Sequence, residues 1–355
     1  MISDVSSILY DTDSYNGSHF EMYPDGTTEV SGYLEPRMNS EHENIAVYGL
    51  QYQLKEYLST HTQRDLSQQN VKKAQRAWEN HGLPFNLQAW EILRDELDGK
   101  LPIEIQSVPE GFWLPKGNVM MQVRNTDSRF YWLPTWLETT LVQVWYPCNV
   151  ATISKEVLMD MYKALEETGC EDIWSVLQFM LHDFGFRGTT CREQAYIGGS
   201  AHLVNFMGTD TFPAMRFIDE YYVNKDKFQG EIPTWGYSIP ASNHAVIMAF
   251  GGPVYEPKAF RHILEKFLRE GKFVACVSDT YNLFRALDIW GTEFRDMILN
   301  SKGRLVVRPD SGDPVVIAPK AILKLMSYFG YTTNAMCYKV LPSVIRLIWG
   351  DGTSP

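Results

Sequence analysis

The chain has 355 residues, of which 45% are apolar, and a formal net charge of −11. This length and apolar content suffice for a large core in one or two domains and exclude a disordered or fibrous protein. Because Lys and Arg are not clustered, the charge argues against nucleic acid or an anionic membrane as the main partner.

The N-terminal segment and the cysteines indicate the compartment. MISDVSSILYDTDSYN carries acidic residues and no apolar signal-peptide core, and no stretch reaches the length of about 18 apolar residues that a membrane helix requires. The five cysteines, at 148, 170, 191, 276 and 337, are widely spaced and form no Cys-x-x-Cys pair. This pattern favours buried, reduced thiols over disulfides or a zinc site, so we expect a soluble, cytoplasmic protein.

The first 150 residues predict a mixed α+β domain. Residues 27–35 are typical of a strand, and residues 65–98 contain two helical patterns separated by Gly82 and Pro84. Residues 101–125 alternate short β-rich runs with turns, which is typical of an antiparallel meander, and residues 131–146 favour helix. We expect this N-terminal domain to span residues 1–150.

From residue 151 onward, helical stretches alternate with short apolar runs. The runs lie at 179–188, 204–210, 236–244, 273–279, 304–313 and 345–352. Such alternation predicts βα units around a parallel sheet, either a (β/α) barrel or an open doubly wound sheet. The last run ends close to residue 355, whereas an eight-unit barrel needs further units, so we expect a domain at 151–355 that is an incomplete barrel.

Each apolar run ends in polar residues, namely Arg187, Asp210, His244, Asp279, Arg308 with Asp310, and Asp351. Both barrels and doubly wound sheets bind ligands at the carboxyl ends of their strands. The alternative to a binding site is that these residues are polar only because they lie in loops, which are exposed to water. Six such endings in succession favour a binding site.

The segment RPDSGDP at 308–314 is the most specific local pattern. A guanidinium beside two carboxylates can hold a diphosphate on one side and ribose hydroxyls or Mg²⁺ on the other. Arg308, Asp310 and Asp313 are therefore candidates for binding a phosphoribosyl donor. A salt-bridged turn that caps a strand is the structural alternative.

Three further residues could bind a ligand or could have a purely structural role. His244 follows the good N-cap residues Ser242 and Asn243, so we expect it at a helix N-terminus, where it could bind a diphosphate or be phosphorylated. Asp210 lies at a strand-to-helix junction and could simply cap the helix. Phe184 lies beside Arg187 on a Gly-flanked loop, where it could stack on a ligand or pack in the core.

Ten segments, in order along the chain, together resemble the nicotinamide phosphoribosyltransferase family. They are TDSYNGSHFEMYP, VYGLQYQL, LPIEIQSVPEGFWLPKGNV, WLETTLVQVWYP, LHDFGFRG, GGSAHLVNFMGTDT, GYSIPASNH, VSDTYN, RPDSGDP and GDG. The resemblance implies a type II phosphoribosyltransferase fold, an irregular (β/α) barrel beside a mixed sheet domain, and a homodimer with shared active sites. It also implies transfer of phosphoribosyl from 5-phosphoribosyl 1-diphosphate to nicotinamide, assisted by Mg²⁺ and stimulated by ATP through a phosphohistidine.

The resemblance also implies roles for residues at the base. Phe184 would stack on one face of the pyridine ring, and Tyr15 of the partner subunit on the other. Asp210 would accept a hydrogen bond from the carboxamide and repel nicotinic acid.

The phosphoribosyl donor would be held by a second set of residues. Arg187 and Arg308 would bind phosphates, and His244 would be the phosphorylated residue, with Asp279 beside it. Asp310, Gly350 and Asp351 would hold the ribose, and Arg37 of the partner subunit would reach the 5′-phosphate. The resemblance identifies no metal ligands.

The sequence departs from the family at its C-terminus, where no GSGGG-type loop follows to hold the 5′-phosphate. Two alternatives to the active enzyme therefore stay open. One is a catalytically inactive remnant or fragment that binds a ligand or partner only. The other is a nicotinate phosphoribosyltransferase.

Overall fold

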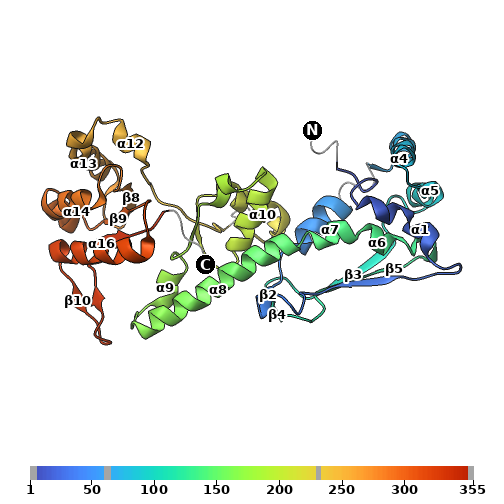
Figure 1. Ribbon diagram of the computed structural model, residues 1–355, viewed down its shortest axis with the longest axis horizontal. Coiled ribbons are helices and arrows are strands. Elements are labelled where there is room, and N and C mark those ends of the chain that lie inside the picture. The colour runs from blue at the N-terminus through green and yellow to red at the C-terminus, as the bar shows by residue number, and fades with distance from the viewer. Residues whose placement is uncertain (1–5, 60–64, 229–232, 351–355) are drawn as a thin grey trace. The chain divides into compact units, whose positions relative to one another are not determined.

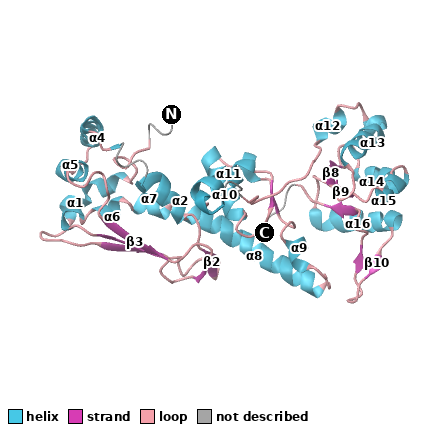
Figure 2. Cartoon of the chain, turned by 180° about the vertical axis from the view of Figure 1, so that it is seen from behind, coloured by secondary structure: helices cyan, strands magenta, loops and turns pink. Residues whose placement is uncertain are grey.

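The computed structural model describes residues 6–59, 65–228 and 233–350 (Figures 1 and 2). The chain forms two compact units, Met1–Met159 with Leu177–Gly236 (unit 1) and Asp160–Val176 with Tyr237–Pro355 (unit 2). These units do not follow the expected boundary at residue 150. That position lies inside the continuous helix α8 (Trp145–Glu167), whose buried residues include Cys148, Ala151 and Leu158.

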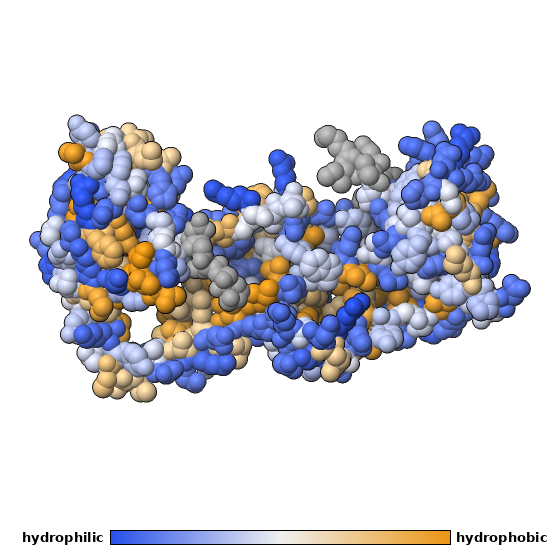
Figure 3. Space-filling model, viewed as in Figure 1, coloured by the Kyte–Doolittle hydropathy of each residue, from blue (hydrophilic) through white to orange (hydrophobic). Residues whose placement is uncertain are grey.

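The N-terminal part of unit 1 contains the two helices expected between residues 65 and 98. In α4 (Gln68–Asn80), Val71, Ala74 and Trp78 are buried at the spacing of one helix face, and the visible surface over this helix is mainly hydrophilic (Figure 3). Ser67 caps α4, and Asn86 caps α5 (Leu87–Asp95). The other elements are η2 (Ser14–Ser18), α1 (His19–Met22), α2 (Leu50–Gln53), η3 (Leu54–Ser59), η4 (Ser128–Phe130), α6 (Leu133–Trp136) and α7 (Glu138–Val142).

The strands of this part are antiparallel, as expected, but their order is not that of a meander. β5 (Met121–Asn125) pairs with both β1 (Ser31–Leu34) and β3 (Ile103–Ser107). β4 (Trp113–Pro115), which lies between β3 and β5 in sequence, instead pairs with β2 (Asn44–Ala46). The turn before β4 directs it there, because Gly111 adopts a φ of 90° and its amide donates to the carbonyl of Val47 at 2.8 Å.

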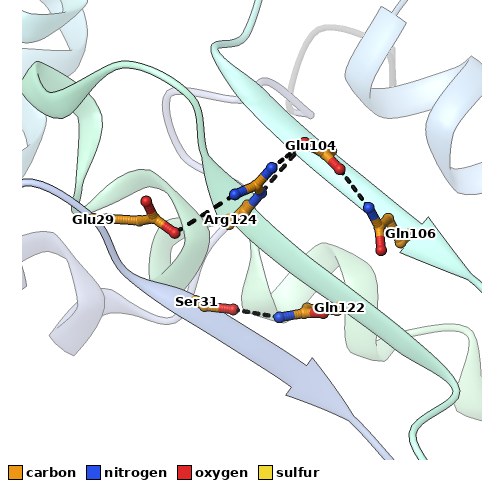
Figure 4. A pocket seen from close by; sticks show the side chains of 6 residues that line it. All are labelled: Glu29, Ser31, Glu104, Gln106, Gln122 and Arg124. Atoms are coloured by element: carbon orange, nitrogen blue, oxygen red, sulfur yellow. Dashed lines mark hydrogen bonds and ion pairs between the residues drawn. The ribbon is translucent and has the colours of Figure 1, made fainter.

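The three-stranded sheet has one apolar and one polar face. Along β5, Met121 and Val123 are buried while Gln122 and Arg124 are exposed, as strand geometry requires. The apolar face packs on a core that contains Trp90. The polar face carries a hollow of about 250 Å³ lined by Glu29, Ser31, Glu104, Gln106, Gln122 and Arg124 (Figure 4). Its exposed ion pairs contribute little to stability.

The second part of unit 1 contains a short parallel pair, β6 (His182–Asp183) and β7 (Gly208–Thr209). Between them lie η5 (Gly185–Gly188) and α10 (Arg192–His202), and after them α11 (Phe212–Tyr221) and η6 (Lys225–Phe228). Gly199 lets α10 approach α11, since a Cβ atom there would lie 2.8 Å from the Cβ of Ala214.

Unit 2 contains a parallel sheet in the order β12-β9-β8. The strands are β8 (Phe273–Val277), β9 (Arg304–Arg308) and β12 (Ile345–Leu347), and a parallel bridge from Ala241 to Ala275 extends the sheet beyond β8. β8 and β9 lie among helices (Figure 2). The helices and remaining strands are α12 (His244–Met248), η7 (Pro253–Tyr255), α13 (Glu256–Phe267), α14 (Leu283–Thr292), α15 (Arg295–Asn300), α16 (Pro314–Phe329), β10 (Thr332–Thr333) and β11 (Lys339–Val340). The division between the units falls within α9 (Ile173–Leu177), whose last residue is assigned to unit 1.

The predicted βα units are therefore confirmed. Five of the six apolar runs contain a parallel strand, and the sixth contributes the bridge at Ala241. Trp290 on α14 anchors the core of unit 2: its ring stacks on Phe260 at 4.0 Å, and its Nε1 donates to Ser278 Oγ at 3.1 Å. This packing fixes the chain directly after β8, where site residues were expected.

The prediction of buried thiols is only partly correct. Cys148 and Cys276 are buried, and burial raises the pKa of Cys148 to about 11 and that of Cys276 to about 12. Cys191 and Cys337 are exposed, because they lie in a loop and in a hairpin turn that the spacing of cysteines does not reveal. In the described ranges, no helix has the length and apolarity needed to span a membrane.

Candidate active site

Asp279 is the centre of a polar cluster at the carboxyl end of β8. Its side chain is only 5% exposed. Oδ1 lies 3.1 Å from Nε2 of His244, and Oδ2 accepts hydrogen bonds from the amide of Asp310 at 2.7 Å and the hydroxyl of Ser311 at 2.6 Å. One buried carboxylate thus joins the loop after β9 to the start of α12.

His244 occupies the expected helix N-terminus. Asn243 is the N-cap of α12, and its side chain accepts from the amide of Val246 at 3.0 Å. The preceding Ser242 is tied to β8, because its hydroxyl accepts from the amide of Val277 at 3.0 Å. The local sequence therefore holds His244 beside the carboxyl end of β8.

Arg308 and Asp310 form a pair at the end of β9. The Nη2 atom of Arg308 lies 3.1 and 3.3 Å from the two carboxylate oxygens of Asp310. Gly350, after β12, packs directly on this pair, since a Cβ atom there would lie 1.8 Å from Oδ1 of Asp310 and 2.7 Å from Nε of Arg308. The fold thus brings together His244, Asp279, Arg308, Asp310 and Gly350 within unit 2.

This cluster combines groups that suit a phosphorylated sugar. A guanidinium binds phosphate oxygens, and carboxylates accept hydrogen bonds from ribose hydroxyls. Asp313, the second carboxylate of RPDSGDP, has a structural role instead, because it caps α16 by accepting from the amide of Val315 at 2.9 Å. Within the described ranges, no three or more His, Cys, Asp or Glu side chains are arranged to hold a metal ion.

Asp279→Asn should destabilise the protein in a pH-dependent way. Burial, the largest influence, raises the pKa of Asp279, but hydrogen bonds from Ser311, Asp310 and His244 together outweigh it and leave the pKa below its usual value. Such a carboxylate stabilises the folded state above the unfolded pKa of about 4, and this contribution is lost as the pH falls through the folded pKa. We expect the variant to lose about 1–3 kcal/mol of unfolding free energy near neutral pH.

Urea unfolding at about pH 7 and about pH 3 checks this expectation, and the difference between variant and wild type should shrink at the lower pH. Asp160→Asn is the matched control, because Asp160 is 79% exposed and pairs with Lys163, which is also exposed. A difference that is equal at both pH values would contradict a role for Asp279 ionisation in stability.

In unit 1, Asp210 lies at the carboxyl end of β7, as expected, but does not cap the following helix. The N-cap of α11 is Thr211. Oδ1 of Asp210 lies 2.9 Å from Nε2 of His182, and its amide donates to the carbonyl of Asp183 at 2.9 Å. Asp183 in turn accepts from Thr209 Oγ1 at 3.1 Å, which fixes the ends of β6 and β7 together.

Phe184 lines a cavity of about 300 Å³ at this end of the strands. His182 and Asp183 from β6, Gly198 and Gly199 from α10, and Thr211 also line it. The ring of Phe184 lies 4.5 Å from that of His182. Arg187, three residues further on, is exposed at the end of η5.

Two predicted site residues lie outside these clusters. Tyr15 is 59% exposed and Arg37 is exposed, and neither lines the cavity beside Phe184. Asp351 lies outside the described residues. Sequence reasoning in turn missed His182, Asp183 and Ser311. The strand-end rule could have found the His-Asp pair, because both residues follow an apolar run directly.

Known proteins match the chain along nearly its whole length. The profile of the nicotinamide phosphoribosyltransferase N-terminal domain matches residues 7–105, and that of the nicotinate phosphoribosyltransferase (NAPRTase) family matches residues 179–354. A nicotinamide phosphoribosyltransferase of Xanthomonas campestris pv. campestris is 41% identical over 352 residues, which are 99% of this chain and 72% of the relative. That of Acinetobacter baylyi is 30% identical, over 96% of this chain and 71% of the relative.

Two solved structures share the fold. The nicotinate-nucleotide pyrophosphorylase of Pyrococcus furiosus has a TM-score of 0.54 and 13% identity, and covers 98% of this chain and 67% of that protein. Human nicotinic acid phosphoribosyltransferase has a TM-score of 0.52 and 16% identity, and covers 96% of this chain and 72% of that protein. These likenesses show the type II phosphoribosyltransferase fold, and the sequence relatives show that the chain belongs to the nicotinamide phosphoribosyltransferase family.

Proposed function

We propose that the chain transfers the phosphoribosyl group of 5-phosphoribosyl 1-diphosphate to nicotinamide, giving nicotinamide mononucleotide and diphosphate for NAD salvage. The observation that carries this proposal is the cluster around Asp279, which joins His244, Asp310 and Ser311 at the ends of parallel strands. Parallel βα folds of this kind bind phosphorylated ligands at that edge.

Arg308 and Asp310 would hold the phosphoribosyl donor. The guanidinium would bind diphosphate oxygens, and the carboxylate would accept from a ribose hydroxyl. Gly350 supports this assignment, because only a residue without a side chain leaves the pair in place. Asp351 would add a second ribose contact, and Arg187 a second phosphate contact.

The base would bind beside Phe184 in unit 1. A flat aromatic ring stacks favourably on a phenylalanine side chain. Asp210 would accept a hydrogen bond from the carboxamide NH₂, and its negative charge would repel the carboxylate of nicotinate, the alternative base.

In the transfer itself, the bond between C1 of the ribose and the diphosphate oxygen breaks, and the electron pair leaves with diphosphate. The pyridine nitrogen of nicotinamide donates its lone pair to C1 to form the new bond. C1 carries positive charge between these events, so the protein's task is to align the two reactants and to neutralise the leaving diphosphate. No nucleophilic side chain is needed.

Mg²⁺ and ATP would assist the reaction. Mg²⁺ binds through phosphate oxygens and one or two carboxylates, and Asp310 offers such an oxygen ligand beside Arg308. ATP would phosphorylate His244. The carboxylate of Asp279 only accepts hydrogen bonds, so Nε2 of His244 would be the donor in their contact and Nδ1 the nitrogen that attacks. Nδ1 would form the N–P bond as the bond to ADP breaks, and Asp279 would take up the Nε2 proton.

A cytoplasmic homodimer would complete the site. Tyr15 of the partner subunit would cover the base, and Arg37 of the partner subunit would reach the 5′-phosphate. The exposure of Tyr15 and Arg37 supports this, since both are accessible on the chain. The five free cysteines suit the reducing cytoplasm.

Phe184→Leu tests the base-binding part of the proposal. Loss of the aromatic face should raise KM for nicotinamide about tenfold while KM for phosphoribosyl diphosphate stays unchanged. Phe186→Leu is the matched control, because Phe186 lies on the same turn but packs on Tyr196 at 6.1 Å. Initial rates of nicotinamide mononucleotide formation measure both constants, and an unchanged KM in Phe184→Leu would refute stacking at this residue.

A further inference from the structure

The parallel pair β6 and β7 brings His182 beside Asp210. His182 lies opposite Gly208 in the strand register, two residues before Asp210. A Cβ atom at residue 208 would lie 2.7 Å from Nδ1 of His182, so the ring has room over β7 because that residue is glycine. From this position Nε2 of His182 lies 2.9 Å from Oδ1 of Asp210.

The two partners of this contact differ in how firmly they are held. His182 is 14% exposed and packs on Phe184, with ring centroids 4.5 Å apart. Asp210 is 44% exposed. An exposed carboxylate samples several rotamers, and a hydrogen bond from a well-packed ring reduces their number. His182 can therefore orient the carboxylate of Asp210.

A carboxylate only accepts hydrogen bonds, so Nε2 of His182 is the donor in this contact. The imidazole of His202, which lies close to His182, adds no positive charge, because burial lowers its pKa.

We infer that His182 is a positioning residue that sets the orientation of Asp210, and through it the choice between nicotinamide and nicotinate. The inference rests on the proposed assignment of Asp210 to the amide of the base. Held in this orientation, Asp210 accepts a hydrogen bond from the carboxamide and repels a carboxylate.

Equilibrium binding tests the inference without requiring turnover. Dissociation constants for nicotinamide and for nicotinate are measured by calorimetry on the 355-residue protein. The two variants are His182→Gln and His182→Leu. Gln offers an N–H close to the position of Nε2, whereas Leu keeps an apolar contact with Phe184 and offers no donor.

In His182→Gln, nicotinamide affinity and the ratio of the nicotinate to the nicotinamide dissociation constant should both stay within about threefold of wild type. In His182→Leu, nicotinamide affinity should fall about tenfold and the ratio should fall with it. Rescue by Gln but not by Leu separates orientation of Asp210 from a purely structural role.

Two results would overturn the inference alone. One is a nicotinamide affinity in His182→Gln as low as that in His182→Leu. The other is wild-type nicotinamide affinity in a folded His182→Leu protein. If wild type binds neither base, the proposed function fails and the inference fails with it.

Discussion

Asp310→Ala should lower the rate of nicotinamide mononucleotide formation at least about 100-fold while the protein remains folded. The carboxylate of Asp310 lies 3.1 and 3.3 Å from Nη2 of Arg308, and both side chains are more than four-fifths buried. Truncation removes the acceptor proposed for the ribose. It also removes the carboxylate that orients the guanidinium of Arg308 toward the diphosphate.

Asp313→Ala is the matched control, because Asp313 lies in the same loop and carries the same charge. Its carboxylate caps α16, so its loss should cost about 1 kcal/mol of stability and leave the rate nearly unchanged. Initial rates at saturating substrates, together with thermal unfolding, measure both effects. Equal loss of activity in the two variants would show that the loop, and not the Arg308–Asp310 pair, governs the reaction.

Gly350→Ala should raise KM for phosphoribosyl diphosphate at least about tenfold, although it adds only one methyl group. That methyl carbon would lie 1.8 Å from Oδ1 of Asp310 and 2.7 Å from Nε of Arg308. Neither separation is possible for non-bonded atoms, so the pair must move. The substitution therefore displaces two proposed ligands of the donor at once without removing either.

Gly252→Ala provides the control in unit 2, because a Cβ atom at Gly252 would have no heavy atom within 4 Å. It should leave KM for both substrates at the wild-type value. Steady-state kinetics with each substrate varied in turn distinguishes the two glycines. A Gly350→Ala enzyme with unchanged KM for phosphoribosyl diphosphate would place the donor away from Arg308 and Asp310.

Much of the site could be predicted because parallel strands obey a simple rule. Each apolar run ends where its strand leaves the sheet, so Asp279, Arg308 and Asp310 could be placed at one edge of unit 2 from the sequence alone. Capping preferences likewise placed His244 at the start of a helix.

Other features depend on contacts between segments that are distant in sequence. The contact between His182 and Asp210 depends on the register in which β6 pairs with β7, and no local sequence pattern specifies that register. The pairing of β4 with β2 in place of β3 and β5 depends in the same way on a long-range choice of partner. Asp210 also shows how capping preferences mislead, since the helix begins one residue later, with Thr211 as its N-cap.

The central claim is most directly tested by the products formed from competing bases. The 355-residue protein is incubated with equimolar nicotinamide and nicotinate, phosphoribosyl diphosphate and Mg²⁺, and the products are identified by mass spectrometry. We expect nicotinamide mononucleotide and diphosphate in equal amounts, with little nicotinate mononucleotide. Predominant nicotinate mononucleotide, or no nucleotide from a folded protein, would contradict it.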